Sequence, residues 1–296
     1  MIYHYLIKDK KGGAETVVKN YVQLLPTKSV IKYTYRKPLK VVFEYRKNID
    51  QKDLHLIHSL RDFAVLCLCL KNVHFFVHFR YTYIKRLLII FLAKISKSKL
   101  VFVGYPGKSA FEKMGWKGGL FFHNFIVNEK GCNHIASESK KIIWLGAIKE
   151  GKNWEHIFEV AELLKHDNYT IDIYGPVMQV NSFEKLLAVS SNVNYKGVTS
   201  DSLSVLSSDY DCCLYTAYNK YEMAPMVLLE CLAVGIPIAC YYSSVNRLYF
   251  QEPRQLPTFG DYEAMASLII NGGTHIRTPD QIGHNILHYF KSRGYE

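Results

Sequence analysis

Two glutamates that stand eight positions apart, Glu222 and Glu230, are the residues of this 296-residue sequence best placed for chemistry. A helix is predicted around them, because Pro225 suits a first helical turn and Gly235 suits the residue after a last one. Residues 226–234 are apolar except for Glu230. A carboxylate in such surroundings is costly unless hydrogen-bond donors meet it. We therefore expect Glu230 to accept hydrogen bonds from ribose hydroxyls, or else to pair with a lysine of its own domain.

The start of the same helix suits a phosphate, because its first N–H groups lack partners within the helix and its dipole is positive there. Glu222 falls on the loop before this helix, where it can reach a sugar. Upstream, Lys149 and Lys152 follow an apolar run and Gly146. By themselves, these two residues could be a pair of solvated surface lysines.

Two weaker signals lie in the first half of the chain. Gly12 and Gly13 follow the first apolar run and open a predicted helix, so the backbone can approach an anionic ligand there. His58, His78 and His123 each end a predicted strand. A histidine in such a position is either a functional residue or a hydrogen-bonded core residue.

Short apolar runs alternate with helical patterns, which predicts parallel sheets covered by helices on both faces. The expected strands are residues 3–7, 41–45, 54–58, 73–78, 100–103, 119–123, 141–145, 170–174, 193–196, 212–215 and 237–241. The expected helices are residues 14–25, 83–95, 154–164, 182–188, 202–207, 225–234 and 280–292. Ligands of open parallel sheets bind beyond the carboxyl ends of strands, where the candidate residues lie.

The segment from Tyr221 to Pro237 resembles the Glu-x7-Glu motif of the retaining, nucleotide-sugar-dependent group 1 glycosyltransferases, which include bacterial surface-polysaccharide transferases. The resemblance implies that Glu222 contacts the donor sugar and that Glu230 holds the ribose. It also implies that the donor is approached by the backbone of Ala224, Pro225, Met226 and Val227. The family's glycine after the first glutamate is Met223 here.

Residues 142–153 resemble the strand, Gly-Arg-x(4)-Lys loop and helix start of the same family. This match implies that Lys152 grips the donor diphosphate beside Gly146. Ala147 stands in the place of the arginine, and Lys149 is a nearby cation that could supply the missing charge.

Other matches to the family are shorter. Gly12 and Gly13 match a Gly-Gly-x-Glu loop that lies beside the donor phosphate and the acceptor. His78 matches a histidine near the reacting sugar, which implies that it binds a sugar hydroxyl. The loops at Gly175 and Val198 match two further loops, the second of them near the nucleotide base.

The resemblance implies an α/β fold of GT-B type, in which two Rossmann-like domains with parallel sheets face a central cleft. We expect an acceptor domain over residues 1–135 and a donor domain over residues 136–278, joined through the polar stretch 127–140. Residues 279–296 are expected to form a C-terminal helix that packs back toward the first domain. Asp209 and Asp211 form an Asp-x-Asp pattern that binds metal in other transferases, but we expect them to be structural.

The implied reaction is transfer of a sugar from a nucleotide diphosphate with retention at the anomeric carbon. In that scheme Lys152, Glu222 and His78 act at the reacting groups, and the leaving diphosphate helps to deprotonate the acceptor. No cofactor and no essential divalent metal are expected.

The net charge of +11 is unevenly divided between the two halves. Residues 1–135 hold 24 Lys and Arg against 8 Asp and Glu, whereas residues 136–296 hold 13 against 18. The basic half predicts an anionic partner, such as lipid headgroups, a pyrophosphate-bearing acceptor or nucleic acid. The apolar run 87–93 is too short to cross a bilayer, and it predicts either a buried helix or one docked on a membrane surface.

A cytoplasmic enzyme bound to the inner face of the cell membrane, with a lipid-linked glycan as acceptor, fits these signals best. The scattered cysteines indicate a reducing compartment, and the N-terminus lacks the pattern of a signal peptide. Two alternatives stay open. The basic half permits a transferase that modifies nucleic acid, and the departures at Ala147 and Met223 permit a nucleotide-sugar-binding partner protein without turnover.

Overall fold

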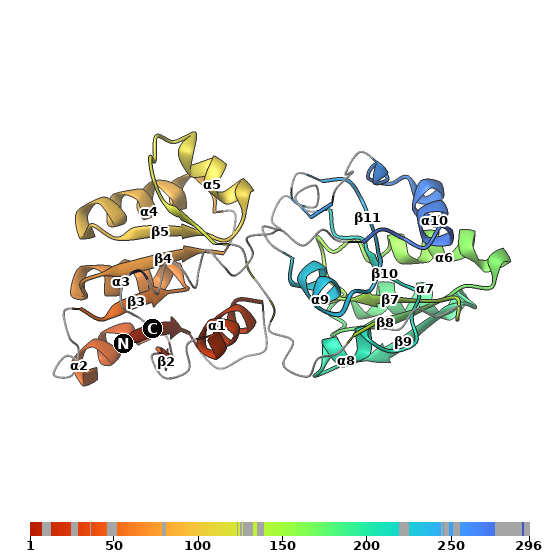
Figure 1. Cartoon of the computed structure of the whole chain (residues 1–296), viewed down its shortest axis with the longest axis horizontal. Helices are drawn as coiled ribbons and strands as arrows, with labels where there is room; N and C mark the ends of the chain where they lie inside the picture. The colour runs from red at the N-terminus through yellow and green to blue at the C-terminus, as the bar shows by residue number, and fades with distance from the viewer. Residues whose placement is uncertain are drawn as a thin grey trace. The chain divides into compact units, whose positions relative to one another are not determined.

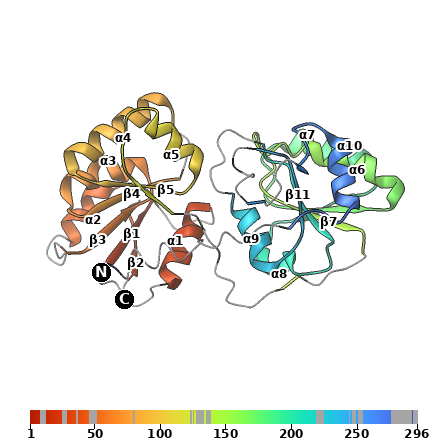
Figure 2. The ribbon, with the colours of Figure 1, turned by 45° about the horizontal axis from the view of Figure 1, so that its top comes forward.

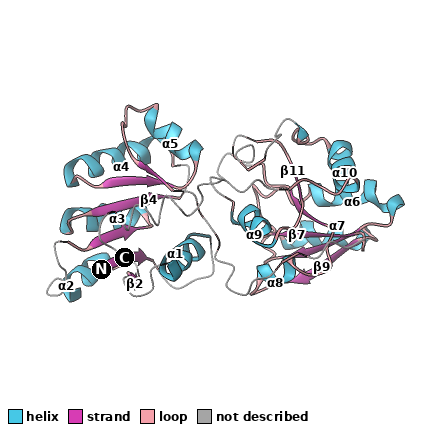
Figure 3. Cartoon of the chain, viewed as in Figure 1, coloured by secondary structure: helices cyan, strands magenta, loops and turns pink. Residues whose placement is uncertain are grey.

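The chain divides into two compact units, one up to Phe125 and the other from Ile126 to Pro279. The computed structural model describes residues 1–7, 13–24, 29–35, 37–45, 52–78, 81–122, 124, 126, 133–134, 139–218, 225–243, 245, 249–250, 255–275 and 292. Helices and strands alternate through both units (Figure 3). The expected helix over 280–292 lies outside the described residues, apart from Ser292.

The first unit is built on a six-stranded parallel sheet with the strand order β2-β1-β3-β4-β5-β6 (Figure 1). Its strands are β1 (Ile2–Leu6), β2 (Ser29–Tyr33), β3 (Leu54–Ile57), β4 (Val73–Val77), β5 (Lys99–Phe102) and β6 (Leu120–Phe121). Its helices are α1 (Gly13–Leu24), α2 (Pro38–Tyr45), α3 (Leu60–Cys69), α4 (Tyr83–Ser96) and α5 (Tyr105–Glu112). β3 and β4 are buried along their whole length, as strands covered on both faces must be.

The order of the strands decides which face each helix covers. The connection from β1 to β2 runs one way along the sheet, and those from β2 to β3, β3 to β4 and β4 to β5 run the other way. Because such crossovers are right-handed, α1 covers one face, and α2, α3 and α4 cover the other. Figure 2 shows α2, α3 and α4 as neighbours in one layer, with α1 across the sheet from them.

The prediction of a strand over residues 41–45 is wrong, because these residues form the second half of α2. A short apolar run such as Val41-Val42-Phe43 fits either a helix or a strand by periodicity alone. Pro38 at the start of the helix favours the helical alternative, since its fixed φ suits a first turn. The prediction missed β2, the edge strand that pairs with β1.

The second unit has a five-stranded parallel sheet with the order β11-β10-β7-β8-β9. Its strands are β7 (Lys141–Leu145), β8 (Thr170–Tyr174), β9 (Val193–Gly197), β10 (Cys212–Tyr215) and β11 (Ile238–Cys240). Its helices are α6 (His156–Leu164), α7 (Val180–Val189), α8 (Ser202–Leu206), α9 (Met226–Val234) and α10 (Tyr262–Ile270), with a short 3-10 turn η1 (Lys165–Asp167). The α/β class with two parallel sheets, predicted from the alternation, is therefore confirmed.

The loops after β7 and β8 lie against each other at their glycines. Gly146 donates its N–H to the carbonyl oxygen of Tyr174 at 3.0 Å, and Gly175 donates to the carbonyl oxygen of Gly197 at 2.8 Å. A Cβ atom at Gly175 would overlap the carbonyl oxygen of Gly146, and the φ of +145° is one that other residues avoid. Glycine at position 175 is therefore required by the packing of two loops.

Replacing Gly175 by alanine is expected to lower the free energy of unfolding by more than about 2 kcal/mol, because the overlap adds to the strained φ. The matched control is Gly197→Ala, whose φ is +83° but whose Cβ would meet nothing within 4 Å. It should cost about 1 kcal/mol through φ alone. Urea unfolding followed by circular dichroism measures both, and equal losses in the two variants would contradict this account of Gly175.

Candidate functional site

The second sheet changes its winding direction between β7 and β10, and this point positions the donor-side candidates. From β7 the chain winds outward through β8 to β9, and it then returns to β10 on the other side of β7. In open sheets of this kind, ligands bind beyond the carboxyl ends of the strands at such a point, where the helical connections diverge. The loop after β7 carries Lys149 and Lys152, and the chain after β10 leads toward Glu222 and α9.

Thr216, the first residue after β10, joins the end of β10 to the loop that follows β7. Its buried hydroxyl accepts a hydrogen bond from Trp144 Nε1 at 2.9 Å and donates one to the carbonyl oxygen of Lys152 at 2.9 Å. Asn153 Nδ2 donates to the carbonyl oxygen of Thr216 at 3.2 Å. The backbone at Lys152 is therefore held at the end of β10 by side-chain bonds on both sides.

The two predicted lysines occupy different positions in this loop. A turn closes between them, in which the N–H of Lys152 donates to the carbonyl oxygen of Lys149 at 3.2 Å. The side chain of Lys149 is exposed, whereas that of Lys152 is half-buried. Gly151 and Asn153 take positive φ angles of 82° and 47°, which turn the chain around Lys152. The loop therefore holds Lys152, rather than Lys149, between the strand end and the residues that precede α6.

The predicted helix after Glu222 is α9, and the backbone N–H groups of its first turn have no partner within the helix. Pro225 is the buried N-terminal cap residue, and Met226 and Val227 are half-buried in the first turn. Gly235 ends the helix in the left-handed conformation with φ 82°. Glu222 and Ala224 themselves lie outside the described residues.

Glu230 is half-buried on α9, and its carboxylate Oε1 accepts a hydrogen bond from Ser202 Oγ at 3.0 Å. Ser202 opens α8, which packs beside α9. Burial raises the pKa of the Glu230 carboxyl, and the hydrogen bond from Ser202 offsets part of that shift. Among the described residues, no lysine, arginine or histidine forms an ion pair with Glu230. The alternative of a lysine partner thus finds no support in this part of the chain.

Gly175 and Val198 follow β8 and β9 at the same edge of the sheet. Gly175 is buried and accepts a hydrogen bond from the Tyr195 hydroxyl at its carbonyl oxygen, 2.8 Å away. Val198 is exposed. Neither Gly175 nor Val198 takes part in the hydrogen bonds that join the Lys152 loop to Thr216.

The first sheet has its own change of winding direction between β1 and β3, and the N-terminal candidates lie there. Gly13 is the first residue of α1, which follows β1, while Gly12 and His123 lie outside the described residues. His58 follows β3, and His78 follows β4. The order of strands thus brings His58 and the start of α1 to neighbouring positions at one edge of the sheet.

Three histidine rings form a hydrogen-bonded chain at this edge. His78 Nε2 lies 2.8 Å from His58 Nδ1, and His58 Nε2 lies 3.4 Å from His4 Nδ1 on β1. Burial lowers the pKa of His4 to about 3 and that of His78 to about 4. The pKa of His58 is also well below its usual value, through burial first and then through its two histidine neighbours. All three rings are neutral at pH 7, so His78 can exchange hydrogen bonds with a neutral hydroxyl.

Asp209 and Asp211 are structural, as expected from their place before β10. Asp211 accepts hydrogen bonds from the backbone N–H groups of Ser139 and Lys140, at 3.2 and 3.0 Å. Asp209 pairs with the ammonium of Lys141 at 3.0 Å. These contacts join the starts of β7 and β10, at the edge of the sheet opposite to Lys152.

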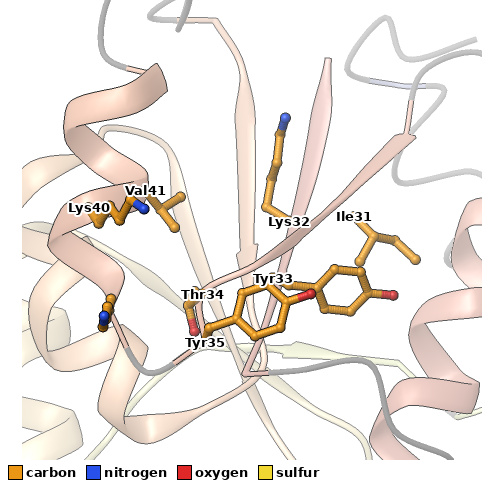
Figure 4. A pocket seen from close by; sticks show the side chains of 8 residues that line it. Ile31, Lys32, Tyr33, Thr34, Tyr35, Lys40 and Val41 are labelled. Atoms are coloured by element: carbon orange, nitrogen blue, oxygen red, sulfur yellow. The ribbon is translucent and has the colours of Figure 1, made fainter.

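The sequence prediction missed Thr216 and Ser202. Both bear hydroxyls at ends of elements that face the carboxyl edge of the second sheet, and Thr216 directly follows a strand that the prediction found. The prediction also missed a pocket of about 600 Å³ in the first unit (Figure 4). It lies at the carboxyl end of β2 and is lined by Ile31, Lys32, Tyr33, Thr34, Tyr35, Lys37, Lys40 and Val41.

In the described part of the chain, none of the helices combines the length and the apolar character needed to cross a bilayer.

Comparison with known proteins relates the second unit to a protein family. Residues 127–269 match the family described as glycosyl transferases group 1. A search of curated proteins finds no match to the sequence.

Solved structures of low sequence identity share the fold of the whole chain. A glycosyltransferase from Rickettsia africae ESF-5 matches with a TM-score of 0.68 at 12% identity, over 99% of this chain and 92% of its own. TarM matches with a TM-score of 0.66 at 15% identity, over 86% of this chain and 53% of TarM. The pneumococcal O-GlcNAc transferase GtfA, solved with UDP and GlcNAc, matches with a TM-score of 0.59 at 13% identity, over 85% of this chain and 55% of GtfA.

The chain spans about half the length of TarM and GtfA. The shared architecture confirms the predicted GT-B fold with two Rossmann-like units.

Replacing Thr216 by valine is expected to lower the free energy of unfolding by about 1–3 kcal/mol, because it leaves the buried Trp144 N–H without its acceptor. Thr216→Ser keeps both hydrogen bonds and should retain most of that stability. The loop should also open, so hydrogen exchange at the amides of residues 149–153 should be faster in the valine variant than in the serine variant. Equal exchange in both would contradict the role assigned to the Thr216 hydroxyl.

Proposed function

From the premise that residues 127–269 belong to the group 1 glycosyltransferases, we propose that this chain transfers a sugar from a nucleotide diphosphate to a glycan or lipid-linked acceptor. One observation carries the proposal. The Thr216 hydroxyl joins the loop of Lys152 to the strand end from which the chain runs to Glu222 and α9. Lys152, the start of α9 and Glu230 thus lie on elements that meet at the ligand-binding edge of one sheet, and the proposal adds Glu222 from the loop before α9.

On the donor side, the half-buried Lys152 binds the diphosphate and stabilises the charge of the leaving group. The backbone N–H groups of Met226 and Val227, in the first turn of α9, add donors for the same phosphates. Gly146 and Gly175 keep the neighbouring loops close together, and Lys149 is an exposed second cation at the rim.

Glu230 holds the ribose in this proposal. Its carboxyl is buried enough to raise its pKa, and the Ser202 hydroxyl is one donor to it. Two ribose hydroxyls would supply the further donors that a desolvated carboxylate needs. The lack of an ion-pair partner among the described residues leaves the negative charge available for a neutral ligand group.

The proposed transfer retains the configuration of the anomeric carbon. The bond from that carbon to the diphosphate oxygen breaks, the acceptor oxygen bonds to the same face, and the acceptor proton passes to the leaving diphosphate. Glu222 and His78 orient the sugar by binding its hydroxyls. Because Lys152 offsets the leaving-group charge, we propose that no divalent metal is essential, and turnover that survives EDTA would support this.

We place the acceptor on a lipid carrier of surface-polysaccharide synthesis, at the cytoplasmic face of the membrane. The basic first half, with 24 Lys and Arg against 8 Asp and Glu in residues 1–135, attracts anionic headgroups or a pyrophosphate-bearing carrier. Steeply salt-dependent binding to DNA, without binding to anionic vesicles, would instead favour nucleic acid as acceptor.

A second candidate function is binding of a nucleotide sugar without turnover. Ala147, where the family's loop has an arginine, is the observation that favours it, because one cation of the phosphate site is then missing. Calorimetric binding of a nucleotide sugar, with no release of nucleoside diphosphate on any acceptor, would decide for this candidate.

Lys152→Ala and Glu222→Ala are each expected to lower the rate of sugar-nucleotide turnover by about 100-fold or more, because each removes a group aimed at the reacting centre. The donor is first found by thermal-shift screening against UDP-, GDP-, ADP- and CDP-sugars, since a ligand at about 100 times its Kd adds about 2.7 kcal/mol of stability. Lys185→Ala, at an exposed position on α7, is the matched control. Wild-type turnover in both test variants would refute the assigned roles.

Glu230→Gln is expected to stabilise the ligand-free protein at neutral pH and to weaken donor binding. The folded-state pKa of Glu230 is raised above its usual value of 4.5, so the unfolding free energy of the wild type falls as pH rises from 4.5 through the raised pKa. Glutamine abolishes this loss, so its advantage in Tm should grow across that window and then stay constant. The thermal shift produced by the donor should shrink.

The control for this experiment is Glu184→Gln, because Glu184 is exposed on α7. It should change neither the pH dependence of Tm nor the donor shift. A lower Tm for Glu230→Gln at neutral pH would show that the ionised carboxylate is stabilised in the fold, which contradicts the proposal.

A further inference from the structure

A stripe of large apolar side chains runs along the outer side of α4. Its members are Ile84, Leu87, Leu88, Phe91 and Ile95, which recur at the spacing of one helical face. Ile84 is 78% exposed and Phe91 is 59% exposed, and the other three are exposed as well. A contiguous exposed stripe of this kind is typical of an interaction site, whereas single exposed apolar residues are ordinary.

In the described part of the chain, this stripe lies outside the buried core. The core side of α4 is a second apolar face, made of the buried residues Ile89, Ile90, Leu92 and Ala93. The helix is therefore apolar on two opposite sides, and only one of them packs against the protein in the described structure. Packing within the described first unit accounts for the apolar residues on the inner face of α4, but it does not account for those on the outer face.

The apolar surface continues onto the neighbouring helices of the same layer. Leu68 of α3 and Leu39 and Phe43 of α2 are also exposed, and α3 packs between α2 and α4. Figure 2 shows these three helices side by side on one face of the sheet. We call this surface, formed by the outward sides of α2, α3 and α4, the outer helix layer.

The charges of α3 and α4 are almost all positive, whereas α2 carries both Lys40 and Glu44. Between Asp62 and Glu112 the sequence has eight Lys and Arg and no Asp or Glu, and Asp62 itself is buried. Lys85 and Lys94 are exposed on the two sides of the apolar stripe. At the far end of the layer, Lys37 and Lys40 line the pocket beside β2.

We propose that the outer helix layer docks on an anionic lipid bilayer, with the α4 stripe inserted at the boundary between headgroups and acyl chains. Apolar residues in the centre and lysines at both sides match the requirements of an interfacial helix. A second copy of this chain fits less well, because a two-fold contact would bring like-charged lysine borders together. The proposal adds a defined surface to the membrane partner of the proposed function, and it does not depend on the identity of the donor.

This docking also places the candidate residues of the first unit near the lipid. α4 begins at Tyr83, five residues after His78, so the start of the stripe lies at the same edge of the sheet as His78. An acceptor with a lipid carrier would therefore enter this edge from the surface on which α4 lies.

Vesicle sedimentation and fluorescence test the proposal on the whole chain. The probes are phosphatidylcholine vesicles with and without phosphatidylglycerol. Ile84→Ser combined with Phe91→Ser should lower binding to the anionic vesicles at least tenfold, and Lys85→Glu combined with Lys94→Glu should do the same. The matched control is Val189→Ser on α7 of the second unit, because Val189 is 80% exposed. The Phe91→Trp variant should show a blue shift in the presence of the anionic vesicles.

Vesicle binding that persists in the serine variant, or that is lost equally in Val189→Ser, would overturn the proposal. So would a concentration-dependent dimer that the serine variant abolishes, since the layer would then be a contact between copies. The thermal shift produced by nucleotide sugars should be unchanged in the serine and glutamate variants. A wild type that binds vesicles but no nucleotide sugar would refute the proposed function and leave the docking surface standing.

Discussion

The hydroxyl of Thr216 is the contact on which the candidate donor site depends. It accepts from Trp144 and donates to the backbone of Lys152, so one buried oxygen joins the core of the sheet to a loop that carries a cation. Parallel pairing of β7 with β10 makes this contact possible, because it brings two strand ends distant in the sequence to the same edge. Without that pairing, the Thr216 hydroxyl could not reach the backbone of the lysine loop.

Buried polar groups lie near the two points where the sheets change their winding direction. In the second unit, Glu230 is desolvated and is met by one serine hydroxyl among the described residues. In the first unit, His4, His58 and His78 are kept neutral by burial and bond to one another. Burying such groups lowers the stability of the fold unless hydrogen bonds meet them.

The two units also differ in what they present to solvent. The second unit matches the group 1 glycosyl transferases over residues 127–269, and its described candidates Lys152 and Val198 follow strands at one edge of its sheet. The first unit carries most of the positive charge and the apolar outer helix layer. In the proposed function, this difference separates the binding of the donor from contact with an anionic partner.

The sequence by itself determined the class of fold and the strands of the second unit, because buried parallel strands are continuous apolar runs and glycines mark where their loops meet. It also named two candidates, Glu230 from its charge on an apolar helix and Lys152 from a loop that resembles the family's, and their roles stay predictions. It failed at residues 41–45, where a short apolar run has no periodicity that separates helix from strand. Only the tertiary structure decided that Thr216 joins the lysine loop to β10, that His58 bonds to His78, and that one apolar face of α4 is exposed. Each of these depends on which distant strands are neighbours, and strand order is set by the packing of the whole sheet rather than by any local pattern.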